Sequence, residues 1–222
     1  AGVMFKEETM TERVNPWLER SIANLVPLST ADIFSDACKE WVFSGEVVDY
    51  GDATEQCELC EHDELRYHFL IENGGNSNQL WVGSSCILRF EEIVVLDENK
   101  RELLDQKERK KVLDKALKAK QIDASLDPLR ALWKVAFDRR STIHNMALEI
   151  KDGKSLPPDS LRVLFELMDK HHIDFRASDY SVNLRSEFDQ FQLSYMPKDM
   201  QKYIWLCMSK QQKNKFRERL GF

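Results

Sequence analysis

Long apolar segments are missing from this 222-residue sequence: no run of 18 apolar residues occurs, so we expect no transmembrane helix. The first six residues also lack the apolar core of a secretory signal peptide. Cysteine is scarce and odd in number, with five residues and one C-x-x-C pair, which does not suit a disulfide framework. Such free thiols are typical of a reducing compartment and of metal binding, so we expect a cytoplasmic protein without a membrane partner.

Common catalytic motifs are absent as well. The sequence contains no G-x-x-x-x-G-K-[ST], no G-x-G-x-x-G, no G-x-S-x-G and no H-E-x-x-H. His62-Asp63-Glu64 and the C-x-x-C pair match the two halves of a zinc deaminase signature, but their order is reversed and they overlap. The Asp-His pair that an HNH-type nuclease needs in its hairpin is missing. These absences favour a binding protein over an enzyme.

The residues with recognisable chemistry lie between Cys57 and Cys86. Cys57 and Cys60 are separated by two residues, so a tight turn can direct both sulfurs at one ion. Residues 65–71 and 80–87 are rich in apolar and aromatic side chains and flank an Asn- and Gly-rich turn, which predicts a β-hairpin. The hairpin would return Cys86 to the other two cysteines. Beyond Cys86, the apolar residues up to Val94 follow helical spacing.

A cysteine pair, a hairpin and a helix with a ligand near its start, in this order, resemble a treble-clef zinc site over residues 57–95. The resemblance implies a structural Zn²⁺ held by Cys57, Cys60 and Cys86, because thiolates are soft ligands and suit a closed tetrahedral shell. Many treble clefs take two ligands from the start of the helix. Here Ser84 and Ser85 stand where a second thiol would be.

The identity of a fourth ligand is less obvious. We favour His62, which lies two residues beyond Cys60; His68 in the hairpin and Cys38 upstream are the alternatives. If no metal is bound, the three cysteines would be small buried fillers of the core.

Charge is distributed unequally along the chain, although the whole carries a net charge of −6. Residues 1–96 contain 6 basic and 18 acidic side chains, whereas residues 97–222 contain 26 basic and 20 acidic ones. An acidic first part and a basic second part indicate separate surfaces, or two parts that attract one another.

Hydrophobic periodicity predicts an α+β protein with an all-α C-terminal domain. We expect a loose segment at 1–15, a zinc-binding α+β module at 16–96, a helical linker at 97–125 and helices over 126–222. The strand expected at 41–50 is interrupted by Gly45, where a β-bulge is predicted. Pro128 is expected to open a new helix that runs to Ile150, and Ser209 with Gln212 forms a predicted capping box.

Two binding functions are compatible with these features, and an enzyme whose site is assembled from scattered residues is a third alternative. The first is nucleic-acid binding of low sequence specificity, in which zinc is structural and basic helices contact phosphates. Its candidate contacts are Lys107, Arg109, Lys110, Lys111, Arg139, Arg140, Lys213, Lys215, Arg217 and Arg219. The second is a protein-interaction adaptor that docks a partner protein on the zinc module or on the helical half, with exposed aromatic residues as anchors.

Overall fold

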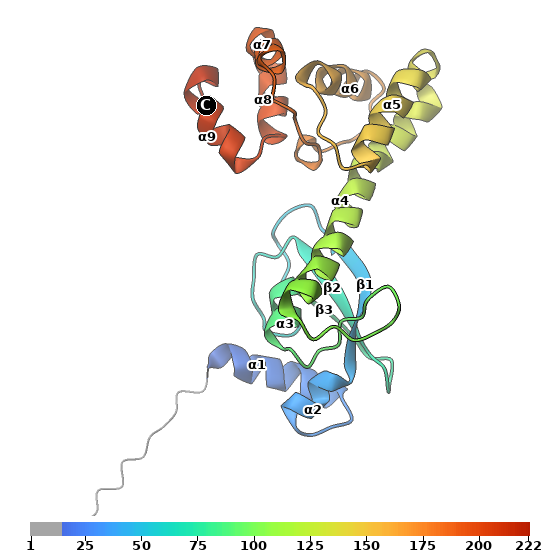
Figure 1. Ribbon diagram of the computed structural model, residues 1–222, viewed down its shortest axis with the longest axis vertical. Helices are drawn as coiled ribbons and strands as arrows, with labels where there is room; N and C mark the ends of the chain where they lie inside the picture. Colours follow the sequence, from blue (N-terminus) through green and yellow to red (C-terminus); the bar gives the residue numbers. More distant parts are fainter. Residues whose placement is uncertain (1–14) are drawn as a thin grey trace, which may run out of the picture. The chain divides into compact units, whose positions relative to one another are not determined.

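The structure is a computed structural model that describes residues 15–222. The chain divides after Leu117 into two compact units, each of which is described by itself (Figure 1). The division falls within residues 97–125, the segment expected to link two domains. Of the expected loose segment 1–15, only Asn15 lies among the described residues, where its side chain caps the first helix.

The first unit combines a three-stranded antiparallel sheet with short helices. The strands pair in the order β1-β2-β3, with bounds β1 Trp41–Asp49, β2 Tyr67–Asn73 and β3 Gln79–Val82. The helices are α1 Pro16–Leu25, the 3-10 turn η1 Val26–Leu28, α2 Phe34–Lys39 and α3 Ser84–Arg89, joined by the first part of α4 Gln106–Val135. Their common core centres on fully buried Trp41, whose indole donates to the Ser29 hydroxyl at 2.8 Å.

The expected hairpin and bulge are both confirmed. Strands β2 and β3 pair from Phe69 opposite Val82 to Glu72 opposite Gln79. The register of β1 against β2 shifts between Phe43 and Val47, and Gly45 in that interval has a φ of +91°. Because only glycine adopts this conformation without strain, the bulge was readable from the sequence.

Helix α3 is shorter than expected, because it ends at Arg89 and not near Val94. Val94 lies beside β1 instead: its N–H donates to the Trp41 carbonyl at 2.8 Å, and its carbonyl accepts from the Phe43 N–H at 2.9 Å. The neighbouring β-branched residues Ile93 and Val95 are fully buried. The spacing of these apolar residues is compatible with a helix, but here the residues form an extended segment in the core.

Helix α4 begins later and ends later than expected. Residues 98–105 are not helical, because the Asp97 side chain accepts from the N–H groups of Asn99 and Arg101 at 2.8 Å and stabilises a turn. The helix then continues through Pro128, so the new helix expected at that residue was wrong. It ends at Val135, before a 3-10 turn, and the expected helix up to Ile150 is thus interrupted.

The second unit, residues 118–222, is mostly helical. Its helices after α4 are η2 Phe137–Arg139, α5 Arg140–Lys151, α6 Pro158–Lys170, η3 Ala177–Asp179, α7 Glu187–Tyr195, α8 Lys198–Leu206 and α9 Lys210–Leu220. The core is built around Phe165, which stacks on Phe175 with ring centroids 4.9 Å apart. The capping box of Ser209 and Gln212 at the start of α9 is confirmed, whereas α7 had no counterpart in the sequence-based expectation.

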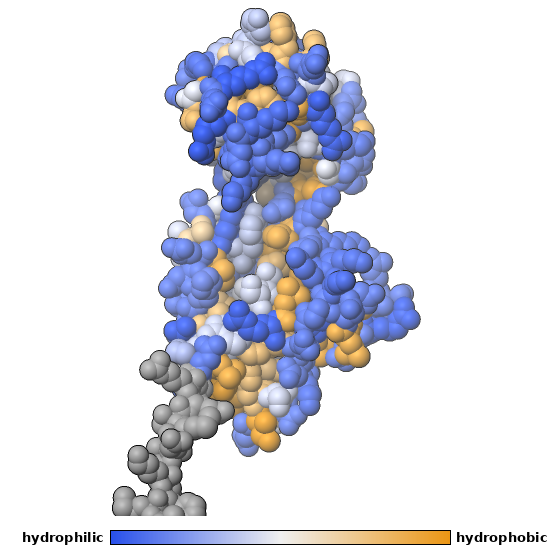
Figure 2. Space-filling model, turned by 60° about the vertical axis from the view of Figure 1, so that its left-hand side comes forward, coloured by the Kyte–Doolittle hydropathy of each residue, from blue (hydrophilic) through white to orange (hydrophobic). Residues whose placement is uncertain are grey.

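The surface view is mainly hydrophilic, with smaller hydrophobic areas on both units (Figure 2). Within residues 15–222, no helix combines the length and apolarity needed to cross a bilayer.

Candidate metal centre

Cys57 and Cys60 lie in a tight turn between β1 and β2. The Glu61 N–H donates to the Cys57 carbonyl at 2.9 Å, and the Cys57 N–H donates to the His62 carbonyl at 2.9 Å. Glu61 takes a left-handed conformation with a φ of +58°, which reverses the chain. The turn therefore places Cys57 and Cys60 close together.

The hairpin brings the third cysteine to this turn. Strand β3 leads through Gly83 into α3, where Cys86 occupies the third position. The Gly83 N–H lies 3.4 Å from the Cys57 sulfur and donates to it. A Cβ atom at Gly83 would come within 3.3 Å of the Leu65 Cδ1 atom, so a larger residue here would require a small shift of the Leu65 side chain.

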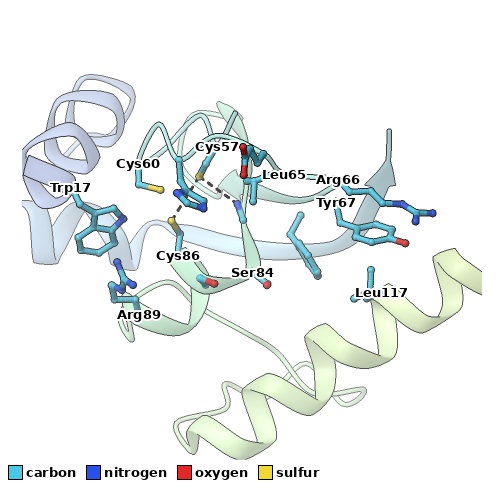
Figure 3. Close-up of a pocket in the computed structure, with 15 residues that line it drawn as sticks. Trp17, Cys57, Cys60, Leu65, Arg66, Tyr67, Ser84, Cys86, Arg89 and Leu117 are labelled. Carbon is cyan, nitrogen blue, oxygen red and sulfur yellow. Dashed lines mark hydrogen bonds between the residues drawn. The ribbon is translucent and has the colours of Figure 1, made fainter. Parts of the chain in front are cut away.

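The three sulfur atoms point toward one another (Figure 3) and lie within 4.8 Å of each other. The Sγ atoms of Cys57 and Cys86 are 3.7 Å apart. Zn–S bonds of about 2.3 Å in a tetrahedron place two sulfurs about 3.8 Å apart, so this pair already has the spacing of a zinc site. All three cysteines are buried. They are thus placed to hold a metal ion and are compatible with zinc.

Electrostatics within the site favour one thiolate. The Cys86 thiol donates to Cys57, and this hydrogen bond lowers the pKa of Cys57 to about 5. Burial opposes this effect, and the nearby main-chain N–H groups of Cys60, Gly83 and Leu59 lower the pKa of Cys57 further. The same interaction raises the pKa of Cys86, with burial as the second cause. The surroundings of Cys57 therefore stabilise the deprotonated sulfur that a metal requires.

A cavity of about 340 Å³ adjoins the three sulfurs. His62, Glu64, Ser84, Ser85 and Arg89 contribute polar groups to its lining, and Trp17 adds an aromatic wall. His62 is exposed, and its imidazole does not belong to the group of ligand atoms within 4.8 Å. Of the four predicted metal ligands, the structure thus brings three together and places the fourth at the rim of the same cavity.

The two alternative fourth ligands do not line this cavity. His68 projects from the opposite face of β2 from Tyr67 and Phe69, which do line it. Its ring is buried and packs edge-on against Tyr50, with centroids 5.2 Å apart. Cys38 is fully buried in α2, and burial raises the pKa of its thiol to about 12. Both residues serve the core of the first unit.

Two side chains of α1 support the cysteine turn and were not predicted. Arg20 Nε donates to the Cys60 carbonyl at 3.1 Å, and Asn24 Nδ2 donates to the Leu59 carbonyl at 3.1 Å. They lie four positions apart and hence on one face of the helix. That spacing is visible in the sequence, but nothing in the sequence connects it with a turn more than thirty residues away.

The predicted phosphate contacts on α4 differ in accessibility. Lys107, Lys110 and Lys111 are exposed. Arg109, by contrast, is 1% exposed, and its guanidinium donates to the carbonyls of Ile87 at 2.7 Å and Glu91 at 3.0 Å. Its guanidinium thus holds the C-terminal end of α3 and the residues that follow. Helix α3 carries Cys86, one of the metal-site cysteines.

The remaining predicted contacts belong to the second unit. Arg139 is exposed and pairs with Asp138 at 3.5 Å, and Arg140 lies over the rings of Trp133 at 4.1 Å and Phe137 at 4.4 Å. The four predicted contacts on α9 are Lys213, Lys215, Arg217 and Arg219. Among the described residues, none of these four makes an ion pair, and all except partly buried Lys213 are exposed.

Comparison of the chain with protein-family models, curated proteins and solved structures gave no match.

Proposed function

We propose that this chain is a zinc-stabilised, non-enzymatic protein that binds nucleic acid with low sequence specificity. Residues 57–95 would hold one structural Zn²⁺ in a treble-clef arrangement, and basic side chains of residues 97–222 would contact phosphates. The observation that carries the binding hypothesis is the set of unpaired cations on α9.

Among the residues that the structure describes, the basic side chains of helix α9 lack acidic partners, whereas several other basic side chains of the second unit are paired. Exposed Arg130 pairs with Asp127, Lys154 pairs with Asp152, and Arg176 pairs with Asp179. On α9, five basic residues accompany a single acid, Glu218, and no ion pair with them occurs within residues 15–222. Unpaired cations concentrated on one helix create a local positive potential, which attracts a polyanion.

The helix is held firmly enough to present these charges. Phe216 and Leu220 are buried and anchor one face to the core, while the capping box at Ser209 and left-handed Gly221 close the two ends. The Lys198 ammonium donates to the Leu220 carbonyl at 3.1 Å and adds another positive charge near the end of α9. Contacts from such side chains to phosphates carry no sequence information, so low specificity is expected.

Support for zinc comes from the three thiols and from the position of His62. The main chain of His62 is tied to Cys57, whereas its imidazole is exposed and makes no hydrogen bond with the described residues. His62 lines the same cavity as the three cysteines, so its imidazole is the candidate for a fourth ligand there. Zinc with three cysteines and one histidine is a common closed structural site. We therefore assign the fourth ligand to His62.

Nucleic-acid binding is tested by titrating the full chain into labelled single-stranded DNA, duplex DNA and RNA at low salt. Replacing Lys213, Lys215, Arg217 and Arg219 together by alanine should weaken binding to every sequence alike. On duplex DNA it should also reduce the slope of log K against log salt, by about 0.9 for each phosphate that the variant no longer neutralises.

The matched control removes four cations that already have acidic partners and are not among the predicted phosphate contacts: Arg130, Lys154, Arg162 and Lys202. Its net charge changes equally, but we expect affinity to remain close to that of the unmodified chain. Failure of the unmodified chain to bind any of the three nucleic acids, or an equal reduction of affinity in both variants, would refute the proposed role of α9.

The adaptor function is favoured by a separate feature of the second unit, an apolar groove between α4 and α5.

A further inference from the structure

Helices α4 and α5 form the two sides of an open groove with a volume of about 510 Å³. Its apolar lining consists of Leu126, Leu129, Trp133, Ile143, Ala147 and Leu148. Leu129 and Ile143 are buried beneath it, whereas Trp133 and Leu148 remain 44% and 49% exposed. Large apolar side chains that stay half exposed beside a buried floor are typical of a binding surface.

The exposed wall of the groove is held in place. Arg140 lies 4.1 Å from the Trp133 ring centroid and donates from Nε to the Trp133 carbonyl at 2.9 Å. The same guanidinium lies over the Phe137 ring at 4.4 Å. Arg140 thus restrains the Trp133 side chain, so a bound partner would have to immobilise it less, at a smaller cost in conformational entropy.

The charges around the groove have one sign. The other residues that line it are Arg130, Lys134, His144 and Lys151, and within the described part of the chain no acidic residue lines it. Arg130 is partly neutralised by Asp127 and Asp123. Lys134 and Lys151 have no such partner within residues 15–222, so two ammonium groups border the apolar surface without a counter-charge.

We infer that this groove binds an acidic amphipathic helix of a partner protein. A helix laid between two helices buries apolar residues at i, i+3, i+4 and i+7, which matches the apolar lining. Glutamates beside that stripe would meet Lys134 and Lys151, which gives the complex its orientation. A nucleic-acid base stacked on Trp133 would leave Leu148 and the aliphatic floor without apolar partners, so the groove suits a peptide better than a nucleic acid. The inference does not depend on the role of α9.

The test uses a fluorescent peptide of about sixteen residues with leucine at these helical positions and glutamate elsewhere. Fluorescence anisotropy with the full chain should give saturable binding in the micromolar range. A shuffled peptide of identical composition and a leucine–lysine version should bind far more weakly, because one lacks the stripe and the other the charge.

Two groove variants separate the apolar from the electrostatic contribution. Leu148→Ser, at an exposed position, and the pair Lys134→Glu with Lys151→Glu should each weaken binding about tenfold or more, which is about 1.4 kcal/mol. The matched control, Lys170→Glu with Lys202→Glu, makes the same charge change away from the groove and should leave affinity unchanged.

Three results would overturn the inference. The first is absence of saturable binding, or equal binding of the shuffled peptide. The second is a concentration-dependent dimer of the free chain that Leu148→Ser abolishes, since a second copy would then be the occupant. The third is a Lys134→Glu and Lys151→Glu variant that no longer binds oligonucleotides but still binds the peptide, which would assign the basic rim to phosphates.

Discussion

The Sγ atoms of Cys57 and Cys86 lie 3.7 Å apart although 29 positions separate the two residues in the sequence. The hairpin of β2 and β3 produces this approach, and the Gly83 N–H at 3.4 Å from Cys57 keeps the helix start against the cysteine turn. The cysteines can bind one ion only if the hairpin forms, and a bound ion would in turn hold the hairpin in place. Metal binding and folding of the first unit are therefore coupled.

Replacing Cys86 by serine should therefore abolish metal binding and unfold the first unit. Structural zinc contributes an apparent binding free energy of about 10–16 kcal/mol in zinc-finger peptides, and many small metal-binding domains do not fold without it. Elemental analysis gives the metal content, and hydrogen exchange resolved along the chain reports which unit loses protection. Cys207→Ser is the control, because Cys207 is a buried thiol of the second unit that donates to the Ala177 carbonyl at 3.0 Å. A full metal content in the Cys86 variant would contradict the assignment.

Replacing His62 by alanine should weaken zinc binding by more than the roughly 10–100-fold that loss of an outer-shell partner costs, while the unit still folds at saturating zinc. Removal of a nitrogen ligand should also change the absorption spectrum of the cobalt-substituted protein. His68→Ala offers the contrast: this buried ring should affect stability and leave the cobalt spectrum unchanged. If the two histidine variants behave in the reverse way, the fourth ligand has been assigned wrongly.

Local signals in the sequence were sufficient for much of the fold. The C-x-x-C turn, the Asn- and Gly-rich hairpin, the bulge at Gly45 and the capping box at Ser209 each depend on a few neighbouring residues. The same signals located the three cysteines that meet in space. Local signals do not show which contacts a segment makes with residues that are distant in the sequence. The residues around Val94 have helical spacing, yet hydrogen bonds to β1 hold them extended.

Non-local burial also decides the role of Arg109. In the sequence it is one of several cations in a polar run, a pattern that predicts a phosphate contact. In the fold it is buried against carbonyls of residues 87–91, and this desolvation lowers its pKa. Helix α7 has no counterpart in the sequence-based expectation for a similar reason. Phe188, Phe191 and Tyr195 face solvent, so the positions of its apolar residues do not predict which face of the helix is buried.

Replacing Arg109 by alanine should destabilise the first unit by about 2–4 kcal/mol. The change leaves buried main-chain carbonyls without donors and removes a large buried side chain. Because these carbonyls follow Cys86, we also expect weaker zinc binding at equal protein concentration. Chemical denaturation monitored in the first unit and a chelator competition measure the two effects. Lys110→Ala, which removes an exposed cation one position away, should change neither quantity, and similar results for both variants would contradict this role of Arg109.

Glu40 provides a prediction about pH. Its carboxylate accepts from the main-chain N–H groups of Thr30 at 2.8 Å and Ala31 at 2.7 Å, and from Asn73 Nδ2 at 2.7 Å. These hydrogen bonds, that of Thr30 first, hold the pKa of Glu40 below its usual value of 4.5. A carboxyl group whose pKa is lowered by folding stabilises the fold above its unfolded pKa, and this contribution disappears as the pH falls through the folded pKa.

Glu40→Gln should accordingly lower the stability of the first unit at neutral pH, because an amide is a weaker acceptor for these donors.

The difference in stability from the unmodified protein should then shrink as the pH is taken from neutrality to below about 4.5, since acid removes the same charge from Glu40. Denaturation of both proteins at a series of pH values measures this difference in stability. Acid releases zinc from both proteins alike, so this effect cancels in the difference. Glu46→Gln makes the same charge change at an exposed carboxylate without a hydrogen bond among the described residues, and it should leave stability equal at every pH. A difference for Glu40→Gln that stays constant down to the lowest pH would show that the charge of Glu40 does not stabilise the fold.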